Sequence, residues 1–337
     1  MIEVLEAGLF TTIQDSGRAG YQKYGVSVGG AVDTVAHRLA NIVIGNDEND
    51  ATLEMTLQGA AFHFREAALL SITGGDMQPR IDGVPVPMWR PVYVHKGNEL
   101  RFGNAVKGAR TYIAVAGGFQ ADEFLGSAST YLQAGFGGHE GRAFQKGGTL
   151  ERNRSSAMSE RIVDQLTEKR INGPFAASDW WVSDMAVPMN NQGEAIRVFE
   201  GRHHHLFEEE SIRSFTEEAY QVDTKSDRMG IRLKGEPLNL SVKEEIISEP
   251  VTFGTIQVPQ NGQPIVLLAD RQTTGGYPKL AQVASADFSK LGQVKPGDKV
   301  RFMMIPHREA ERLLLEQEQY IRWCRSAIRR KVEEGHI

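Results

Sequence analysis

Short stretches in which apolar and polar residues alternate recur along the chain, and this period of two residues is typical of β-strands that bury one face. Clusters of Gly, Pro, Asn and Asp separate the stretches and are typical of turns. The predicted strands are Ile2–Glu6, Ala61–Phe64, 69–73, 92–95, 99–102, 111–116, 196–199, 256–258, 265–269 and 299–305. Many short strands joined by turns favour barrels or sandwiches over alternating strand–helix units.

Three segments instead repeat their apolar residues at the spacing of an α-helix. Asp33 is suited to cap a helix over 33–44, and Gly45 is suited to end it. A weaker pattern covers 155–166, and the clearest runs from 307 to 334. At ~1.5 Å per residue, this last helix would extend about 40 Å. We therefore predict a mainly β fold with some α and a long C-terminal helix.

One sequence pattern occurs in both halves of the chain. Residues 97–102 (GNELRF) and 297–302 (GDKVRF) each place a Gly turn before a strand, and Gly147 begins a shorter copy. A common turn–strand pattern explains this similarity, and so do two similar β units. Polar residues from 153 to 193 mark a boundary between such units. The predicted domains are 1–190, which includes a connecting segment, 191–306, and a helical tail over 307–337.

Composition and charge narrow the function classes. The length of 337 residues suits about two domains. A net charge of −5 argues against a mainly electrostatic nucleic-acid binder. The single cysteine, Cys324, excludes an intramolecular disulfide and a cysteine-based zinc site, and it suits a reducing cytosol. Because the first residues lack a basic region followed by a long apolar one, we expect no signal peptide. No apolar stretch approaches the ~20 residues of a membrane helix. We expect a cytoplasmic protein without membrane contact.

Two polar loops carry the candidate chemistry. Residues 11–21 and 270–277 each combine a Thr-Thr pair, a Gln, an Asp, an Arg and a downstream Tyr. Arginine offers a planar fork to a carboxylate, while Asp and Gln match the N–H and C=O groups of an amide. We predict that the two loops form walls of one cleft for a small amide, urea, lactam or carboxylate. Alternatively, their side chains cap the loops' own backbone.

Other polar segments are weaker candidates. The side chains of His203, His204 and His205 cannot all face one metal from regular backbone, so we predict no metal site. A solvated turn and a single functional histidine remain alternatives there. The Gly-rich stretch 134–142 lacks the Lys-Ser/Thr ending of a phosphate-binding loop, and the chain contains no Gly-x-Ser-x-Gly nucleophile motif. The basic end of the C-terminal helix is either a solvated face or a docking surface for an acidic partner.

Several motifs in order resemble the urea-carboxylase-type carboxyltransferase family, also labelled allophanate hydrolase subunit 2, which includes the C subunits of bacterial ATP-dependent 5-oxoprolinases. The resemblance spans roughly residues 3 to 305. The motifs are TIQDSGRxGY at 12–21, AN at 40–41 with Asn46, LE at 53–54, VAGG at 115–118, GSxST at 126–130, SDRMG at 226–230, GxIQVP at 254–259 and DRQTTGGY at 270–277. The chain departs from the family at Ala128, where an arginine is frequent, and this removes a guanidinium that could contact an anion.

The resemblance implies two cyclophilin-like β-barrel domains and an enzyme that hydrolyses 5-oxo-L-proline to L-glutamate with ATP cleavage. It further implies the A and B subunits of 5-oxoprolinase as partners, with ATP bound at a site shared with a partner chain. No biotin attachment motif is present. Two alternatives stay open: a non-catalytic regulator that binds a kinase-inhibitor partner of related fold, and a carboxyltransferase for urea-like substrates that uses a separate biotin carrier. A homo-oligomer is a further option.

Residue chemistry suggests roles within this scheme. Asp270 would orient a lactam N–H or act as a base, and Arg271 or Arg228 would hold an anion. The expected substrate-binding residues are Gln14, Asp15, Arg18, Gln257, Gln272, Thr273, Thr274, Gly275, Gly276 and Tyr277. The reaction partner is expected to be a small amide or lactam rather than a nucleic acid.

Overall fold

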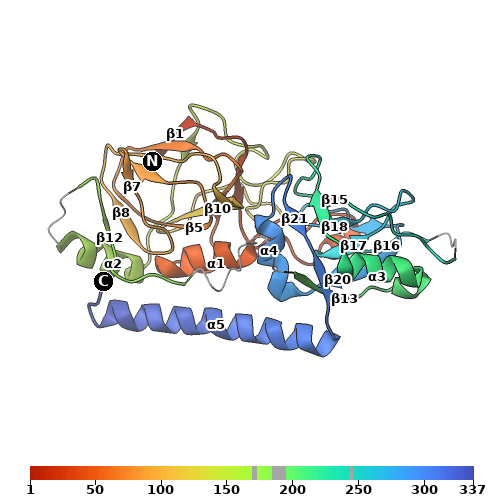
Figure 1. Ribbon diagram of the computed structural model, residues 1–337. Coiled ribbons are helices and arrows are strands. Elements are labelled where there is room, and N and C mark those ends of the chain that lie inside the picture. Colours follow the sequence, from red (N-terminus) through yellow and green to blue (C-terminus); the bar gives the residue numbers. More distant parts are fainter. Residues whose placement is uncertain (169–172, 184–194, 243–245) are drawn as a thin grey trace. The chain divides into compact units, whose positions relative to one another are not determined.

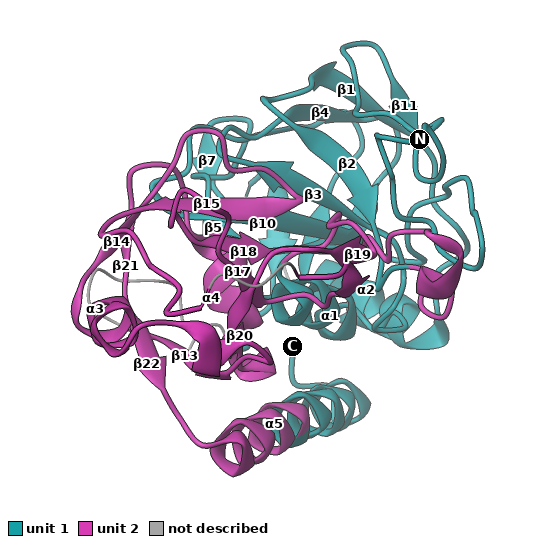
Figure 2. Ribbon diagram, turned by 90° about the vertical axis from the view of Figure 1, so that its right-hand side faces the viewer, with its two compact units in different colours: residues 1–17, 33–187, 319–337 teal, residues 18–32, 188–318 magenta. Residues whose placement is uncertain are grey.

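A computed structural model describes residues 1–168, 173–183, 195–242 and 246–337. The chain forms two compact units (Figures 1 and 2). Unit 1 comprises residues 1–17, 33–187 and 319–337, and unit 2 comprises 18–32 and 188–318. The predicted domains assigned 18–32 to the N-terminal half, whereas the structure assigns this segment to unit 2. The predicted change of domain between residues 190 and 191 lies outside the described residues.

Unit 1 contains two six-stranded sheets. The first has the order β11 (Thr149–Leu150), β1 (Ile2–Glu6), β4 (Ala61–Phe64), β9 (Glu99–Arg101), β6 (Arg80–Ile81) and β7 (Val84–Pro85). The second has the order β12 (Phe175–Ala177), β8 (Val92–Val94), β5 (Ala68–Asp76), β10 (Lys107–Val115), β3 (Thr52–Thr56) and β2 (Thr11–Gln14). Both sheets contribute to one apolar core, which includes Phe62, Leu70 and Ile113. Burial of these side chains is the main stabilising term of the unit.

Helix α1 (Thr34–Val43) packs against β5 and β10 of the second sheet (Figure 1). The predicted cap is confirmed, because an Asp33 carboxylate oxygen accepts a hydrogen bond from the Ala36 amide at 3.0 Å. Hydroxyl groups from the sheet satisfy the helix backbone: Ser71 donates to the Ala40 carbonyl and Thr73 to the Ala36 carbonyl. The helix therefore rests on a polar face of the sheet.

Unit 2 is built on an eight-stranded sheet. Its order is β21 (Lys299–Val300), β14 (Tyr220–Val222), β15 (Gly230–Lys234), β18 (Ile265–Leu267), β17 (Thr255–Gln257), β20 (Lys279–Val283), β13 (Ile196–Glu200) and β22 (Phe302–Met304). Because Arg301 alone separates β21 from β22, the two ends of this order are one segment of chain, and the sheet closes as a barrel. Apolar side chains such as Val198, Ile256 and Leu280 fill it.

Smaller elements complete the chain. Strands β16 (Glu249–Pro250) and β19 (Thr274–Gly275) form a separate two-stranded ribbon in unit 2. Helices α3 (Glu209–Glu217) and α4 (Phe288–Gln293) also belong to unit 2, and α2 (Ala157–Glu168) belongs to unit 1. Helix α5 (His307–Glu333) contributes its residues up to 318 to unit 2 and the rest to unit 1.

The predicted fold class is confirmed, since the structure is mostly β with few helices and one long C-terminal helix. Each predicted strand overlaps an observed one, and the repeated pattern is structural in both halves. Gly97 and Gly297 have φ values of 93° and 91° and precede β9 and β21. The loop predicted over 11–21 was partly wrong, because Thr11–Gln14 forms β2. All four of its residues are buried, so β2 lacks the alternation that indicates a strand.

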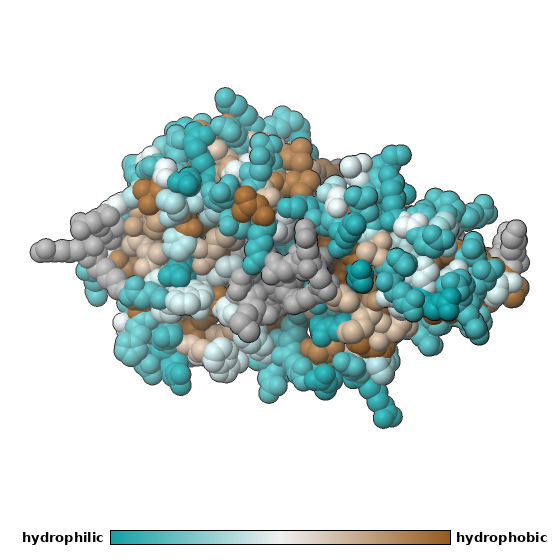
Figure 3. Space-filling view, in the orientation of Figure 1, coloured by the Kyte–Doolittle hydropathy of each residue, from teal (hydrophilic) through white to brown (hydrophobic). Residues whose placement is uncertain are grey.

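No helix in the described ranges is long and apolar enough to cross a membrane. Figure 3 shows hydrophilic residues over much of the viewed face, with apolar residues between them.

Candidate functional site

A polar cavity of about 450 Å³ lies in unit 2, between the barrel strands and the loop that contains β19. Three predicted substrate-binding residues line it: Gln257 from β17, and Gln272 and Tyr277 from the loop. Charged residues of both signs lie around it, namely Asp223, Lys225, Asp227, Arg232 and Lys234. The cavity can therefore offer amide and charged groups to a small polar ligand.

Gln257 is held tightly beside the loop. Its side chain is almost fully buried, and its Nε2 group lies 3.5 Å from the Tyr277 carbonyl. A Cβ atom on Gly275 would lie 2.6 Å from that Nε2, so glycine allows the loop backbone to approach the amide. The same loop contains Thr273, Thr274 and Gly276, and β19 begins at Thr274.

Arg228 and Asp270 form a buried ion pair. Arg228 donates through Nε to Oδ2 of Asp270 at 2.9 Å and through Nη2 to Oδ1 at 3.1 Å. Its Nη2 also donates to the Gly30 carbonyl at 2.7 Å. The neighbouring carboxylate in the sequence, Asp227, instead accepts from the Met229 amide at 2.8 Å. Arg228 and Asp270 thus support each other beneath the loop, and neither is among the described residues that line the cavity.

Arg271 has a different environment. Its guanidinium donates through Nη1 to the Leu268 carbonyl at 3.1 Å and through Nε to the Val251 carbonyl at 3.5 Å. In the described residues no carboxylate forms an ion pair with it. Burial lowers the pKa of Arg271 to about 10, and the nearby Asp270 opposes that shift. The side chain is thus a buried cation bound by backbone carbonyls, and it is not among the described residues that line the cavity.

Part of the first predicted loop accompanies this site. Residues 18–32 belong to unit 2, and Gln22 donates from Nε2 to the carbonyls of Val251 and Thr273. Ser27 donates to the Arg271 carbonyl at 2.9 Å. Arg18 is buried in this segment, and its backbone amide donates to the Val28 carbonyl. Residues 11–17 belong to unit 1, so the predicted cleft shared by both loops stays a prediction.

Gln14 and Asp15 occupy unit 1. Both carboxylate oxygens of Asp15 are used: they accept from the hydroxyls of Ser127 and Ser129 and from the Ala128 amide. Gln14 is fully buried and donates to the Thr12 hydroxyl. Asp15 and Ala128 also line a cavity of about 360 Å³ whose described lining contains no basic residue. Because position 128 is alanine rather than arginine, no basic side chain in the described lining lies beside the carboxylates of this cavity.

A buried polar network in unit 1 was not predicted from the sequence. The residues Thr12, Glu54, Tyr112 and Thr73 lie in register across β2, β3, β10 and β5. The Tyr112 hydroxyl donates to Glu54 at 2.7 Å, and burial raises the pKa of Tyr112 well above its ordinary value. The sequence feature that could have indicated this network is Glu54, a charged residue in the middle of the buried strand β3.

His37, on α1, belongs to the same network. The Thr52 hydroxyl donates to the Gln14 carbonyl at 3.2 Å, so it must accept from Nδ1 of His37 at 2.9 Å. Nε2 then carries a lone pair, and no group in the described residues donates to it. Burial lowers the pKa of His37 to about 4, although Asp15 and Glu54 oppose the shift. The imidazole is neutral near pH 7.

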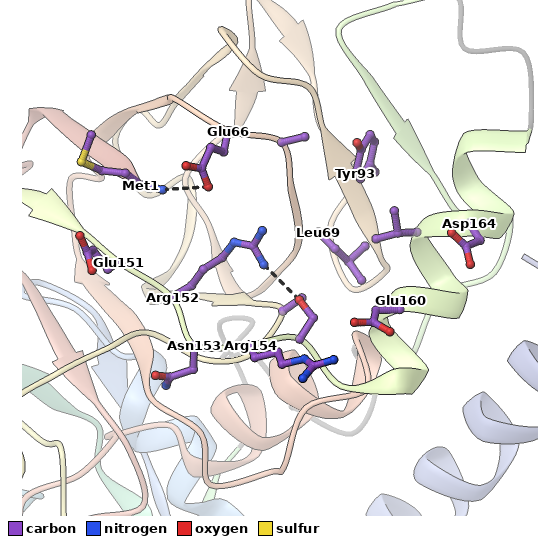
Figure 4. A pocket seen from close by; sticks show the side chains of 14 residues that line it. Met1, Glu66, Leu69, Tyr93, Glu151, Arg152, Asn153, Arg154, Glu160 and Asp164 are labelled. Atoms are coloured by element: carbon purple, nitrogen blue, oxygen red, sulfur yellow. Dashed lines mark hydrogen bonds and ion pairs between the residues drawn. The ribbon is translucent and has the colours of Figure 1, made fainter.

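Another cavity in unit 1, of about 720 Å³, contains none of the predicted site residues (Figure 4). Glu66 pairs with the Met1 amino group, and Arg152 donates to the Ser155 hydroxyl. Glu160 and Asp164 reach it from α2. Its exposed charges of both signs define no single ligand chemistry.

The histidine run begins in a turn at His203 and continues into the short 3₁₀ helix His204–Leu206. Nδ1 of His203 accepts from the Lys279 amide at 3.2 Å, so this imidazole joins the turn to β20. Nowhere in the described ranges do three or more His, Cys, Asp or Glu side chains gather as metal ligands would.

Comparison with known families identifies the class. The family described as "Carboxyltransferase domain, subdomain A and B" matches residues 24–304. This chain belongs to that carboxyltransferase-domain family, and the predicted resemblance is confirmed.

Individual relatives narrow the comparison. The chain is 35% identical to the C subunit of 5-oxoprolinase from Escherichia coli (strain K12) over 95% of its own length and 96% of the relative. It is 34% identical to the corresponding C subunit from Haemophilus influenzae over 99% of both chains. The urea amidolyase of Lachancea kluyveri is 30% identical over 95% of this chain, which spans 18% of that protein.

Solved structures confirm the fold. The urea amidolyase of K. lactis matches 95% of this chain with a TM-score of 0.82 and 28% identity, and the match covers 20% of that structure. TTHA0988 matches 90% of this chain with a TM-score of 0.71 and 29% identity, covering 55% of that structure.

Proposed function

We propose that the chain is the C subunit of an ATP-dependent 5-oxoprolinase complex. The complex would hydrolyse 5-oxo-L-proline to L-glutamate while ATP is cleaved to ADP and phosphate, with one water molecule consumed for each bond. The observation that supports this is the 35% identity to a 5-oxoprolinase C subunit, with 96% of that relative covered. Similarity over nearly the whole relative favours an equivalent role in a complex with the A and B subunits.

The polar cavity of unit 2 supports the proposal, because amide side chains line it. A lactam presents an adjacent C=O and N–H, and the Gln257 amide can pair with such a group. Arg271 would hold the substrate carboxylate or a phosphoryl oxygen, because it is a cation bound chiefly by carbonyls. Asp270 keeps Arg228 neutralised. Because neither Asp270 nor Arg271 is among the described residues that line the cavity, each would reach the lactam only if the loop moved toward it. ATP, at a site shared with a partner chain, would supply activation of the amide oxygen.

The test is the Arg271→Ala variant in the complex reconstituted with the A and B subunits. We expect kcat/KM for glutamate formation from 5-oxoproline to fall about 100-fold, as when a charged stabilising group is lost. Arg213→Ala is the matched control, since Arg213 is exposed and pairs with Glu210. Unchanged activity of Arg271→Ala and of Asp270→Asn would remove the loop from the mechanism. A wild-type complex without 5-oxoproline-dependent ATP hydrolysis would refute the proposed function.

A second candidate is a carboxyltransferase that acts on urea-like substrates. The TM-score of 0.82 with a urea amidolyase supports it. This activity would require a biotinylated carrier from another chain. Carboxylation of urea that depends on such a carrier, without glutamate formation from 5-oxoproline, would favour this second candidate.

A further inference from the structure

The β16–β19 ribbon of unit 2 is joined to the barrel by side-chain contacts. In the ribbon, Glu249 lies opposite Gly275 and Pro250 lies opposite Thr274. The Val251 amide extends the pairing by donating to the Thr273 carbonyl at 3.1 Å. The ribbon therefore carries the loop that forms one wall of the polar cavity.

A single carboxylate, Glu249, joins this ribbon to β20 and to the turn after β13. Its Oε1 accepts from Lys279 Nζ at 2.5 Å, and its Oε2 lies 2.8 Å from Nη1 of Arg202. Nε2 of His203 lies 3.7 Å from Oε1. Because Nδ1 of this imidazole accepts a backbone amide, its proton resides on Nε2 and faces the carboxylate.

Lys279 connects the ion pair to the cavity. It lies directly opposite Gln257 across β17 and β20, and both side chains are buried. Glu249 is the carboxylate that forms an ion pair with Lys279 in the described part of the chain. Because a buried ammonium that loses its carboxylate is strongly disfavoured, the pair resists displacement of the ribbon.

We propose that Glu249 is a positioning residue that, through its ion pair with Lys279, holds the loop between the cavity-lining residues Gln272 and Tyr277 against Gln257. The close approach of Gly275 to Gln257 Nε2 depends on the ribbon's position. Loss of the pair would move the wall and loosen substrate binding while leaving the Arg228–Asp270 ion pair intact. The effect on substrate rests on the proposed function, whereas the positioning of the loop does not.

Glu249→Gln tests this role, since it keeps the shape of the side chain and removes its charge. We expect hydrogen–deuterium exchange of peptides covering 249–251 and 270–277 to accelerate at least tenfold. In the reconstituted complex, KM for 5-oxoproline should rise about tenfold with kcat changed less than twofold. Glu210→Gln is the control, because Glu210 is exposed and pairs with Arg213.

The double variant Glu249→Gln/Lys279→Met separates positioning from simple stabilisation. It removes the unpaired buried cation, so the melting temperature should recover toward that of the wild type. The raised KM and the fast exchange should persist. If KM and the exchange rate returned to their wild-type values together with the melting temperature, the proposal would be overturned. A folded Glu249→Gln variant in which 270–277 exchanges at the wild-type rate would also overturn it. Exchange decides the positioning claim even if the complex proves inactive on 5-oxoproline.

Discussion

At the scale of single residues, buried charges and polar groups are the features that need explanation, because burial is costly unless each group is paired. Arg228 and Asp270 neutralise each other, and Lys279 and Glu249 do the same. In the described residues, Arg271 is held by backbone carbonyls alone. Because no carboxylate among those residues neutralises it, Arg271 is a stronger candidate for anion binding than Arg228.

His37 gives a pH-dependent prediction at this scale. Burial lowers its pKa from the ordinary 6.5 to about 4, so the folded protein favours the neutral imidazole. The associated stability is complete above pH 6.5 and is lost as pH falls from 6.5 toward 4. The loss amounts to about 3 kcal/mol, at ~1.4 kcal/mol per pH unit.

Urea unfolding at pH 7.5 and pH 4.5 measures this effect. The free energy of unfolding should fall between pH 7.5 and pH 4.5 in both proteins. We expect the fall in His37→Gln to be about 2–3 kcal/mol smaller than in the wild type. His336→Gln is the control, since His336 is exposed near the C-terminus. Equal acid sensitivity of the wild type and His37→Gln would show that this imidazole is not the group responsible.

At the scale of elements, helix α5 illustrates how one face of a helix becomes structural. Its buried side chains in unit 1 are Ile321, Cys324, Ile328 and Val332, which recur at intervals of three or four residues. Gln165 on α2 donates to the Val332 carbonyl at 2.7 Å, and Arg325 pairs with Glu48 at 2.8 Å. This part of the helix therefore packs within unit 1, while the side chains of Arg322, Arg329, Arg330 and Lys331 are exposed.

Two truncations in α5 test that assignment. Ile328 is 3% exposed, so Ile328→Ala should lower the free energy of unfolding by about 2–4 kcal/mol. The matched control is Leu315, which is 70% exposed. Leu315→Ala should change the free energy of unfolding by less than about 0.5 kcal/mol. Denaturant titration measures both. Similar losses in the two variants would contradict the observed burial pattern.

At the scale of the whole molecule, membership of the carboxyltransferase-domain family and near-complete coverage of the 5-oxoprolinase C subunit agree with the motif order in the sequence. The chain spans only about a fifth of the urea amidolyases it matches, so those proteins contain much that is absent here. The candidate residues of unit 2 come from several segments of the chain, and the barrel brings them together.

The sequence alone determined the features that depend on local periodicity and local chemistry. Alternating positions located strands such as β1 and β4, Asp33 indicated the start of α1, and Gly97 indicated the turn before β9. These features follow from backbone geometry over a few residues. The polar loop at 270–277 was equally visible, because its density of hydrogen-bonding groups exceeds what a turn needs.

Only the tertiary structure decided which distant groups meet. Arg228 pairs with Asp270, 42 positions along the chain, rather than with its neighbour Asp227. The segment 18–32 joins unit 2, and the pairing partners of β21 and β22 close the barrel. His37 and Glu54 become one buried network because strand register and helix packing place them there. Such long-range pairings depend on the energy of the whole core, which no local pattern encodes.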